Sequence, residues 1–135
     1  MFPSTTAHLL ASLVVVATGI LLIGFAGMVY TRPARAERIL MSFASSARAH
    51  YLEQTLRLLL GASLVLLSPT MWQGTAFWIL GWSIVVSSVV LMLLPWRLHH
   101  SFAGHVLPKL VAHMKLFAIG VFAFGAILLM ALYKS

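Results

Sequence analysis

Polar side chains that could handle a proton or an ion recur at helical spacing inside a largely apolar stretch. His50, Glu53 and Arg57 are separated by steps of three and four residues, which places them on one face of a helix. Gln54 lies beside them. Glu53 precedes Arg57 by four residues, the order that favours an ion pair along a helix. Such a pair inside a membrane is typical of a proton path, an ion path or a substrate site, and it can also simply hold helices in register.

Histidine is the second residue type with chemical potential. Neutral imidazoles can bind zinc, copper or haem iron. His50 and His113 each begin an expected membrane span, so this pair could face each other as metal or haem ligands. The sequence has only two carboxylates, Glu37 and Glu53, whereas di-iron helical bundles need several. We therefore expect no cofactor, and His50 and His113 are the residues to consider if a metal binds.

The motifs of common enzyme classes are missing from the sequence. It has no Cys and no Asp, and no Ser lies in a Gly-x-Ser-x-Gly elbow. No glycine-rich phosphate loop or dinucleotide fingerprint is present. We expect no catalytic residue, and the protein is not expected to be an enzyme.

The amino-acid composition indicates what kind of protein surrounds these polar residues. Of 135 residues, 61% are apolar and 8% are charged, and the mean hydropathy is +1.02. Soluble domains have roughly 45–50% apolar and about 25% charged residues. A soluble globule of this size cannot bury so much apolar surface. The composition excludes a soluble enzyme, a disordered chain and a nucleic-acid-binding domain, and it predicts an all-α integral membrane protein.

Four segments are long enough to cross a bilayer, which takes about 20 mostly apolar residues. Three of them are almost free of charge, and a fourth carries the polar residues Glu53 and Arg57. The expected spans are residues 9–30, 50–68, 75–94 and 113–133. The segment 50–68, which carries the charged residues, could instead be a half-helix that does not cross. The uncharged run after Arg57 reaches only Ser68 before Pro69.

The distribution of basic residues decides between these possibilities. Lys and Arg favour the cytoplasmic side of a membrane. Eight of the nine Lys and Arg residues, all but Lys134, lie in the segments 31–57 and 95–115. Four spans put both segments on one side, whereas three spans would separate them. We therefore predict four spans in a bacterial inner membrane, with both chain ends on the outer side. The net charge of +7 is then explained by membrane lipid, and we expect no nucleic-acid partner.

The spans are expected to form one domain, a four-helix bundle built from two helical hairpins. Segment 33–48 is predicted to be an amphipathic helix lying in the membrane interface, and segment 96–112 a second interfacial segment that Pro108 interrupts. Small residues are expected to mark close helix contacts, and the candidates are Gly19, Gly24, Gly27, Gly120 and Gly125, with Ser83 and Ser87 as a pair in the third span. The candidates for lipid head-group contact are Arg32, Arg35, Arg38 and Arg97, which could alternatively serve only to fix the topology.

Parts of the sequence resemble a known group of proteins. They are the stretch from Ala49 to Gly61, AHYLEQTLRLLLG, followed by Gly81-Trp82 and by Leu94-Pro95-Trp96-Arg97. These residues, in the central half of the chain, resemble small uncharacterised four-span proteins of bacterial inner membranes. The resemblance implies a location, and it implies no activity and no ligand.

Two functions agree with these expectations. In the first, the protein is a non-catalytic accessory or assembly subunit that binds membrane lipids and the helices of partner subunits or of its own copies. In the second, it is a small oligomeric transporter or channel in which Glu53 and Arg57 form a gate or a proton relay. Four short spans rarely enclose a pathway alone, so the second function requires several copies.

Overall fold

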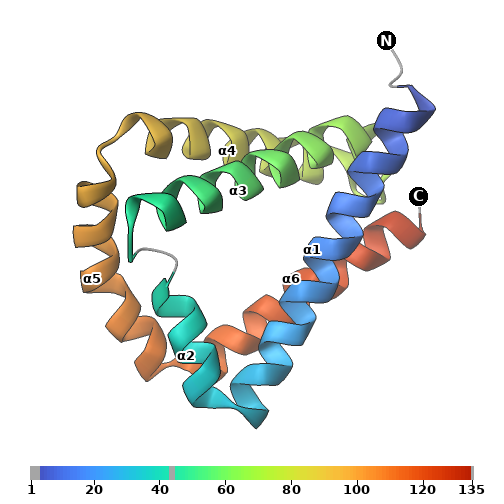
Figure 1. Ribbon diagram of the computed structural model, residues 1–135. Helices are drawn as coiled ribbons and strands as arrows, with labels where there is room; N and C mark the ends of the chain where they lie inside the picture. The colour runs from blue at the N-terminus through green and yellow to red at the C-terminus, as the bar shows by residue number, and fades with distance from the viewer. Residues whose placement is uncertain (1–3, 43–44, 135) are drawn as a thin grey trace.

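The computed structural model describes residues 4–42 and 45–134, without the side chain of His99. Within these residues the regular structure is entirely helical (Figure 1). Four long helices occur close to the predicted spans, and two further α-helices and a short 3₁₀ helix connect them. The helices are α1 (Thr5–Thr31), α2 (Pro33–Ser42), α3 (Ala47–Leu67), η1 (Ser68–Thr70), α4 (Gly74–Leu93), α5 (Trp96–Ala112) and α6 (Met114–Tyr133).

Local sequence signals explain several of these boundaries. The hydroxyl of Ser4 accepts a hydrogen bond from the Ala7 amide at 3.1 Å, and Ser46 caps α3 in the same way through Ala49. Pro33 occupies the first position of α2, where its missing N–H costs nothing. Pro108 was expected to interrupt the second interfacial segment, but α5 continues through it. Phe43 and Ala44, which belong to the predicted segment 33–48, lie outside the described residues.

The long helices pack as two antiparallel pairs, α1 with α6 and α3 with α4. The buried residues of α1 follow each other at steps of three, four and seven, as expected for a helix packed along one side. In each pair the two backbones approach most closely where two glycines meet. A Cβ atom on Gly19 would lie 3.1 Å from the Gly125 carbonyl oxygen, and one on Gly61 would lie 2.9 Å from that of Gly81. Small residues allow this approach.

The two pairs meet at one end only (Figure 1). There, the end of α3 and the turn after it pack between α1 and α6. We call this apolar contact the junction cluster; its members are Ala11, Val15, Leu64, Leu67, Met71, Phe77, Leu128 and Ala131. The Trp72 amide also donates to the Ala131 carbonyl at 3.2 Å. From the junction the pairs diverge, and α2 and α5 form the third side of a triangle.

This arrangement differs from the predicted four-helix bundle, which is not confirmed. The predicted hairpins joined residues 9–30 to 50–68 and 75–94 to 113–133, whereas the most extensive contacts are α1 with α6 and α3 with α4. The physical reason lies in the connections. Helices α2 and α5 stand between the pairs at the end opposite the junction, so the four long helices cannot stay side by side along their whole length.

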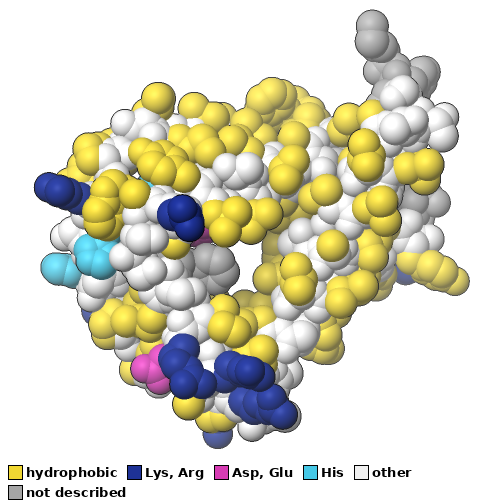
Figure 2. Space-filling model, viewed as in Figure 1, with side chains coloured by type: hydrophobic (Ala, Val, Ile, Leu, Met, Phe, Trp, Pro, Cys, Tyr) yellow, Lys and Arg dark blue, Asp and Glu magenta, His cyan; other side chains and the backbone are white. Residues whose placement is uncertain are grey.

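Helix α2 docks through the apolar face that the sequence predicts. Ala36 is fully buried against Val29 and Met114, and Leu40 packs against the same cluster. The opposite face of α2 carries exposed arginines. Figure 2 shows basic side chains gathered over α2, whereas the visible faces of α1, α3 and α4 are mostly apolar. The arginines of α2 and the junction cluster therefore lie at opposite ends of the molecule.

Three of the described helices, α1, α4 and α6, are long and apolar enough to cross a membrane. These three helices support the prediction that the chain is a membrane protein. Helix α3 is long enough, but its Arg48, Glu53 and Arg57 make it less apolar than the other three.

Candidate functional site

The predicted polar face of α3 packs directly against α4. His50 is 1% exposed and Gln54 is 0% exposed. The Nε2 atom of His50 lies 3.0 Å from the carbonyl oxygen of Leu91, so that nitrogen carries the proton and donates it. We use the name polar seam for His50, Gln54 and Arg57 of α3 together with Ser87 and Ser88 of α4. Every member except Arg57 and Ser87 is buried.

Arg57 takes its partner from the neighbouring helix. Its Nη2 atom donates to the hydroxyl oxygen of Ser87 at 2.9 Å. The ion pair predicted between Glu53 and Arg57 is absent from the described residues, and both side chains are half-buried. The reason is geometric, because α4 offers a hydroxyl at the level of Arg57. A contact across to α4 therefore replaces a contact along α3.

Gln54 and Ser88 lie at the same level of the α3–α4 pair. The Gly61–Gly81 contact fixes the antiparallel register. Gln54 lies seven residues before Gly61 in α3, and Ser88 lies seven residues after Gly81 in α4. Both side chains are 0% exposed. The two amide atoms of Gln54 and the hydroxyl of Ser88 have no hydrogen-bond partner in the structure. Buried polar groups are normally satisfied, so this layer of the polar seam carries a cost in stability.

We expect Gln54→Leu to stabilise the protein, by about 1 kcal/mol, because it removes an unpaired buried amide and keeps the side-chain volume. The measurement is unfolding in detergent followed by circular dichroism. Gln54→Ala is the matched control, and it should be less stable than Gln54→Leu because it leaves a cavity. A loss of stability in Gln54→Leu would show that the amide has a partner, such as Ser88 or a bound water.

The polar seam ends at the Gly61–Gly81 contact. A Cβ atom on Gly81 would lie 2.8 Å from the Gly61 carbonyl oxygen, so the two backbones leave no room for a polar side chain there. Towards the turn between α3 and α4, the fully buried Leu64 and Leu67 and the nearly buried Phe77 follow. Ser63 and Ser68 are also buried there, and their hydroxyls donate to the carbonyls of Leu59 and Val65 in α3. The polar seam thus reaches partway along the α3–α4 pair, and beyond it the buried residues are apolar apart from two serines whose hydroxyls bond to carbonyl groups of α3.

Sequence reasoning found the α3 half of this seam, and in the α4 half it named Ser87 but missed Ser88. Ser83 and Ser87 were the expected small-residue contact, but Ser83 is exposed and donates to the Ile79 carbonyl of its own helix. The serines that face α3 are Ser87 and Ser88. The signal that could have found Ser88 is the spacing of Phe77, Gly81 and Ser88, the three buried residues of α4, at steps of four and seven.

The structure does not bring His50 and His113 together. His50 lies in the α3–α4 pair, whereas His113 is exposed between α5 and α6, in a pocket that Val29 also lines. The Nε2 atom of His50 donates to Leu91, so this nitrogen is not free to bind a metal. Within the described residues, no three His, Cys, Asp or Glu side chains form a group that could hold a metal ion.

The four predicted head-group residues are all exposed. Arg32, Arg35 and Arg38 lie at or within α2, and Arg97 lies in the first turn of α5. Their guanidinium groups are therefore free to reach a phosphate, as surface arginines do. This exposure agrees with lipid contact and equally with a purely topological role.

Comparisons with known protein families, with curated proteins and with solved structures give no match to this chain.

Proposed function

We propose that the protein is a non-catalytic accessory or assembly subunit of a bacterial inner membrane, which it crosses with α1, α3, α4 and α6. In this proposal both chain ends lie on the outer side, and α2 and α5 lie in the cytoplasmic interface. The partners are membrane lipids and the helices of other subunits. The membrane setting has the support of three helices of sufficient length and hydropathy. The crossing by α3 and the role as a subunit rest on further observations.

The orientation of α3 is the observation that carries the proposal. This helix buries His50 and Gln54 and exposes Leu52, Leu56 and Leu59, which are 58%, 52% and 51% exposed. A helix on the surface of a soluble protein does the reverse, with apolar residues inward and polar residues outward. In a membrane, polar side chains face the protein interior and leucines face lipid. The exposed and buried faces of α3 therefore suit a crossing helix.

Charge placement agrees with a crossing by α3. With four spans, eight of the nine Lys and Arg residues, all but Lys134, belong to one side of the membrane or to the cytoplasmic half of α3. The chain ends and the junction cluster belong to the other side. This asymmetry is the one that cytoplasmic loops of membrane proteins carry.

The largely apolar packing beyond Gly61 favours a subunit over a transporter. A proton or ion path through α3 and α4 would need free polar groups beyond Gly61. There the structure has Leu64, Leu67 and Phe77, and the buried hydroxyls of Ser63 and Ser68 are bonded to carbonyl groups of α3. Conversely, the α1–α6 pair offers room for another helix. A Cβ atom on Gly24, Gly27 or Gly120 would have no neighbour within 4 Å. Gly27 also lines an apolar groove of about 390 Å³ between α1 and α6.

Purification at low detergent from the native membrane tests this proposal. We expect a complex of fixed stoichiometry with a different membrane protein, and we expect Gly27→Leu to dissociate it because the added side chain keeps a partner helix away. Gly104→Leu in α5 is the matched control, since that glycine also has open space around it. A homo-oligomer with Glu53 in a polar cavity would favour the transporter, and a complex that survives Gly27→Leu would contradict the proposed contact.

A further inference from the structure

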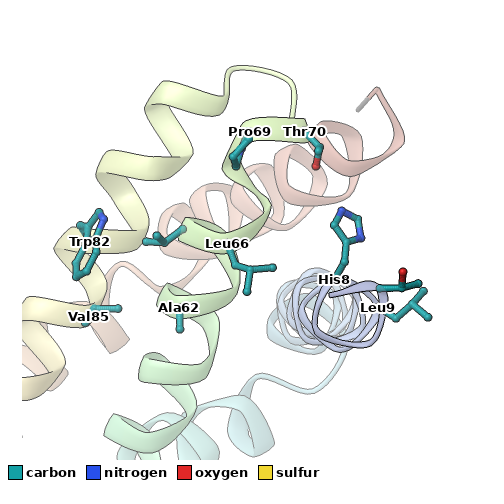
Figure 3. Close-up of a pocket in the computed structure, with 10 residues that line it drawn as sticks. His8, Leu9, Ala62, Leu66, Pro69, Thr70, Trp82 and Val85 are labelled. Carbon is teal, nitrogen blue, oxygen red and sulfur yellow. The ribbon is translucent and has the colours of Figure 1, made fainter. Parts of the chain in front are cut away.

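A groove of about 1010 Å³ lies near the junction cluster, between α1, α3 and α4. Figure 3 shows α3 in the middle, with Ala62 and Leu66 on its exposed side. His8 and Leu9 approach from α1 on one side, and Trp82 and Val85 come from α4 on the other. We call this feature the outer groove. It lies away from the polar seam, and none of the residues discussed above as functional candidates lines it.

The lining of the outer groove is amphipathic along its length. Its polar side chains, Thr5, His8 and Thr70, come from the start of α1 and from η1, which is the end where the chain reverses. The rest of the lining is apolar apart from the indole nitrogen of Trp82, and includes Leu9, Ala62, Val65, Leu66 and Val85. None of the lining residues is an Arg, Lys, Asp or Glu. The polar end therefore suits a neutral, oxygen-rich group and offers no ion pair to a charged one.

The length of the outer groove is close to the thickness of one leaflet of a bilayer. Along α3 and η1 the lining runs from Ala62 to Thr70, which are eight residues apart. At 1.5 Å per residue this is about 12 Å. The hydrocarbon core of a membrane is about 30 Å thick, so one leaflet contributes about 15 Å. A single lipid chain that enters at the level of Thr5 and Thr70 would therefore end near Val85.

We infer that the outer groove holds one acyl chain of a membrane phospholipid, with its ester carbonyl groups at the level of Thr5 and His8. The hydroxyl and imidazole groups of these two residues can donate to ester oxygens, whereas the Thr70 hydroxyl already donates to the Leu67 carbonyl at 3.0 Å. The apolar floor on α3 matches the chain. This lipid is separate from the head groups that the arginines of α2 would contact at the opposite end of the molecule. The inference rests on the membrane crossing in the proposed function and is independent of any partner subunit.

Lipid retention through purification tests the inference. Protein is washed in detergent, and the phospholipid that remains is counted per chain by native mass spectrometry. We expect about one bound phospholipid on the wild-type protein. Ala62→Phe places a ring on the floor of the groove and should lower retention about tenfold, because losing contact with two methylene groups is enough for that change. Ala123→Phe is the matched control on the exposed side of α6, and it should retain the lipid.

Two further results complete the test. With Trp72, Trp78 and Trp96 replaced by Phe, the fluorescence of Trp82 should be quenched when the retained lipid has brominated chains, and Ala62→Phe should remove this quenching. Equal retention by Ala62→Phe and Ala123→Phe would overturn the inference, as would a wild-type protein that retains no lipid. If Ala62→Phe loses its helical signal, Leu9→Phe, at an exposed position of α1, replaces it with the same expected outcome. Partner binding is measured separately, so a failure here does not affect that proposal.

Discussion

Gly61→Val is expected to separate α3 from α4. A Cβ atom at this position would lie 2.9 Å from the Gly81 carbonyl oxygen and 2.8 Å from a methyl group of Val85. The Val85 side chain can move, but the carbonyl belongs to the backbone of α4, so the helices must move apart. Overpacking of this kind costs about 1–3 kcal/mol, and we expect the upper end of that range because the contact is between backbones. The measurement is the free energy of unfolding in mixed detergent micelles.

The matched control for this variant is Gly120→Val. Gly120 lies in the apolar helix α6, and a Cβ atom there would have no neighbour within 4 Å. The same change in chemistry should therefore alter stability by less than about 0.5 kcal/mol. If the two variants unfold at the same denaturant concentration, the Gly61–Gly81 contact does not hold α3 against α4.

The positions of the helices could be predicted from the sequence. Apolar runs separated by Pro and by basic residues predicted the four long helices to within a few residues, and Pro33 marked the start of α2. These features are local, because the length of an apolar run and the capping residues depend only on neighbours in the chain. The segment after Pro95 also has its predicted bounds, since α5 spans Trp96–Ala112.

The pairing of the helices could not be predicted in the same way. Gly19, Gly24, Gly27, Gly120 and Gly125 all appeared suited to close contact, but only Gly19 and Gly125 meet another backbone. Apolar spans offer similar surfaces all around, so their composition does not reveal which side faces a neighbour. The choice depends on both partners at once. For the same reason, the α3–α4 contact at Gly61 and Gly81 was not expected.

The candidate site was predicted in part. The spacing of His50, Glu53 and Arg57 predicted a shared face with Gln54 beside it. The structure buries His50 and Gln54 and leaves Glu53 and Arg57 half-buried. The prediction of an ion pair between Glu53 and Arg57 failed because it considered α3 alone. Ser87 of α4 provides the partner for Arg57. A contact between helices of opposite direction depends on their register, which the sequence of either helix does not contain.

A second large effect is expected in the sidedness of the chain. If α3 crosses the membrane, η1 and the start of α4 lie on the outer side with the amino terminus, and both α2 and α5 lie on the cytoplasmic side. If α3 does not cross, the start of α4 shares a side with α2, and α5 moves to the opposite side. If α3 crosses, Thr75 lies on the side opposite Arg38, and Arg97 lies on the same side as Arg38. If α3 does not cross, both of these assignments are reversed. Each position is therefore assigned wholly to one side of the membrane or the other, with no intermediate outcome.

The side of each position can be measured by labelling single cysteines, because the chain itself contains no Cys. Thr75 is an exposed position for a single cysteine, whereas Gly74 is unsuitable because a Cβ atom there would overlap the Ser68 carbonyl oxygen. Arg38→Cys and Arg97→Cys mark α2 and α5, and Ser4→Cys marks the amino terminus. All four positions are exposed to a reagent from their own side.

Labelling of these four single-cysteine variants in intact cells with a reagent that does not cross membranes tests most directly whether α3 crosses. We expect Ser4→Cys and Thr75→Cys to react, and Arg38→Cys and Arg97→Cys to react only after the membrane is opened. Reaction of Thr75→Cys on the same side as Arg38→Cys would show that α3 stays on one side, and the four-span account would be wrong.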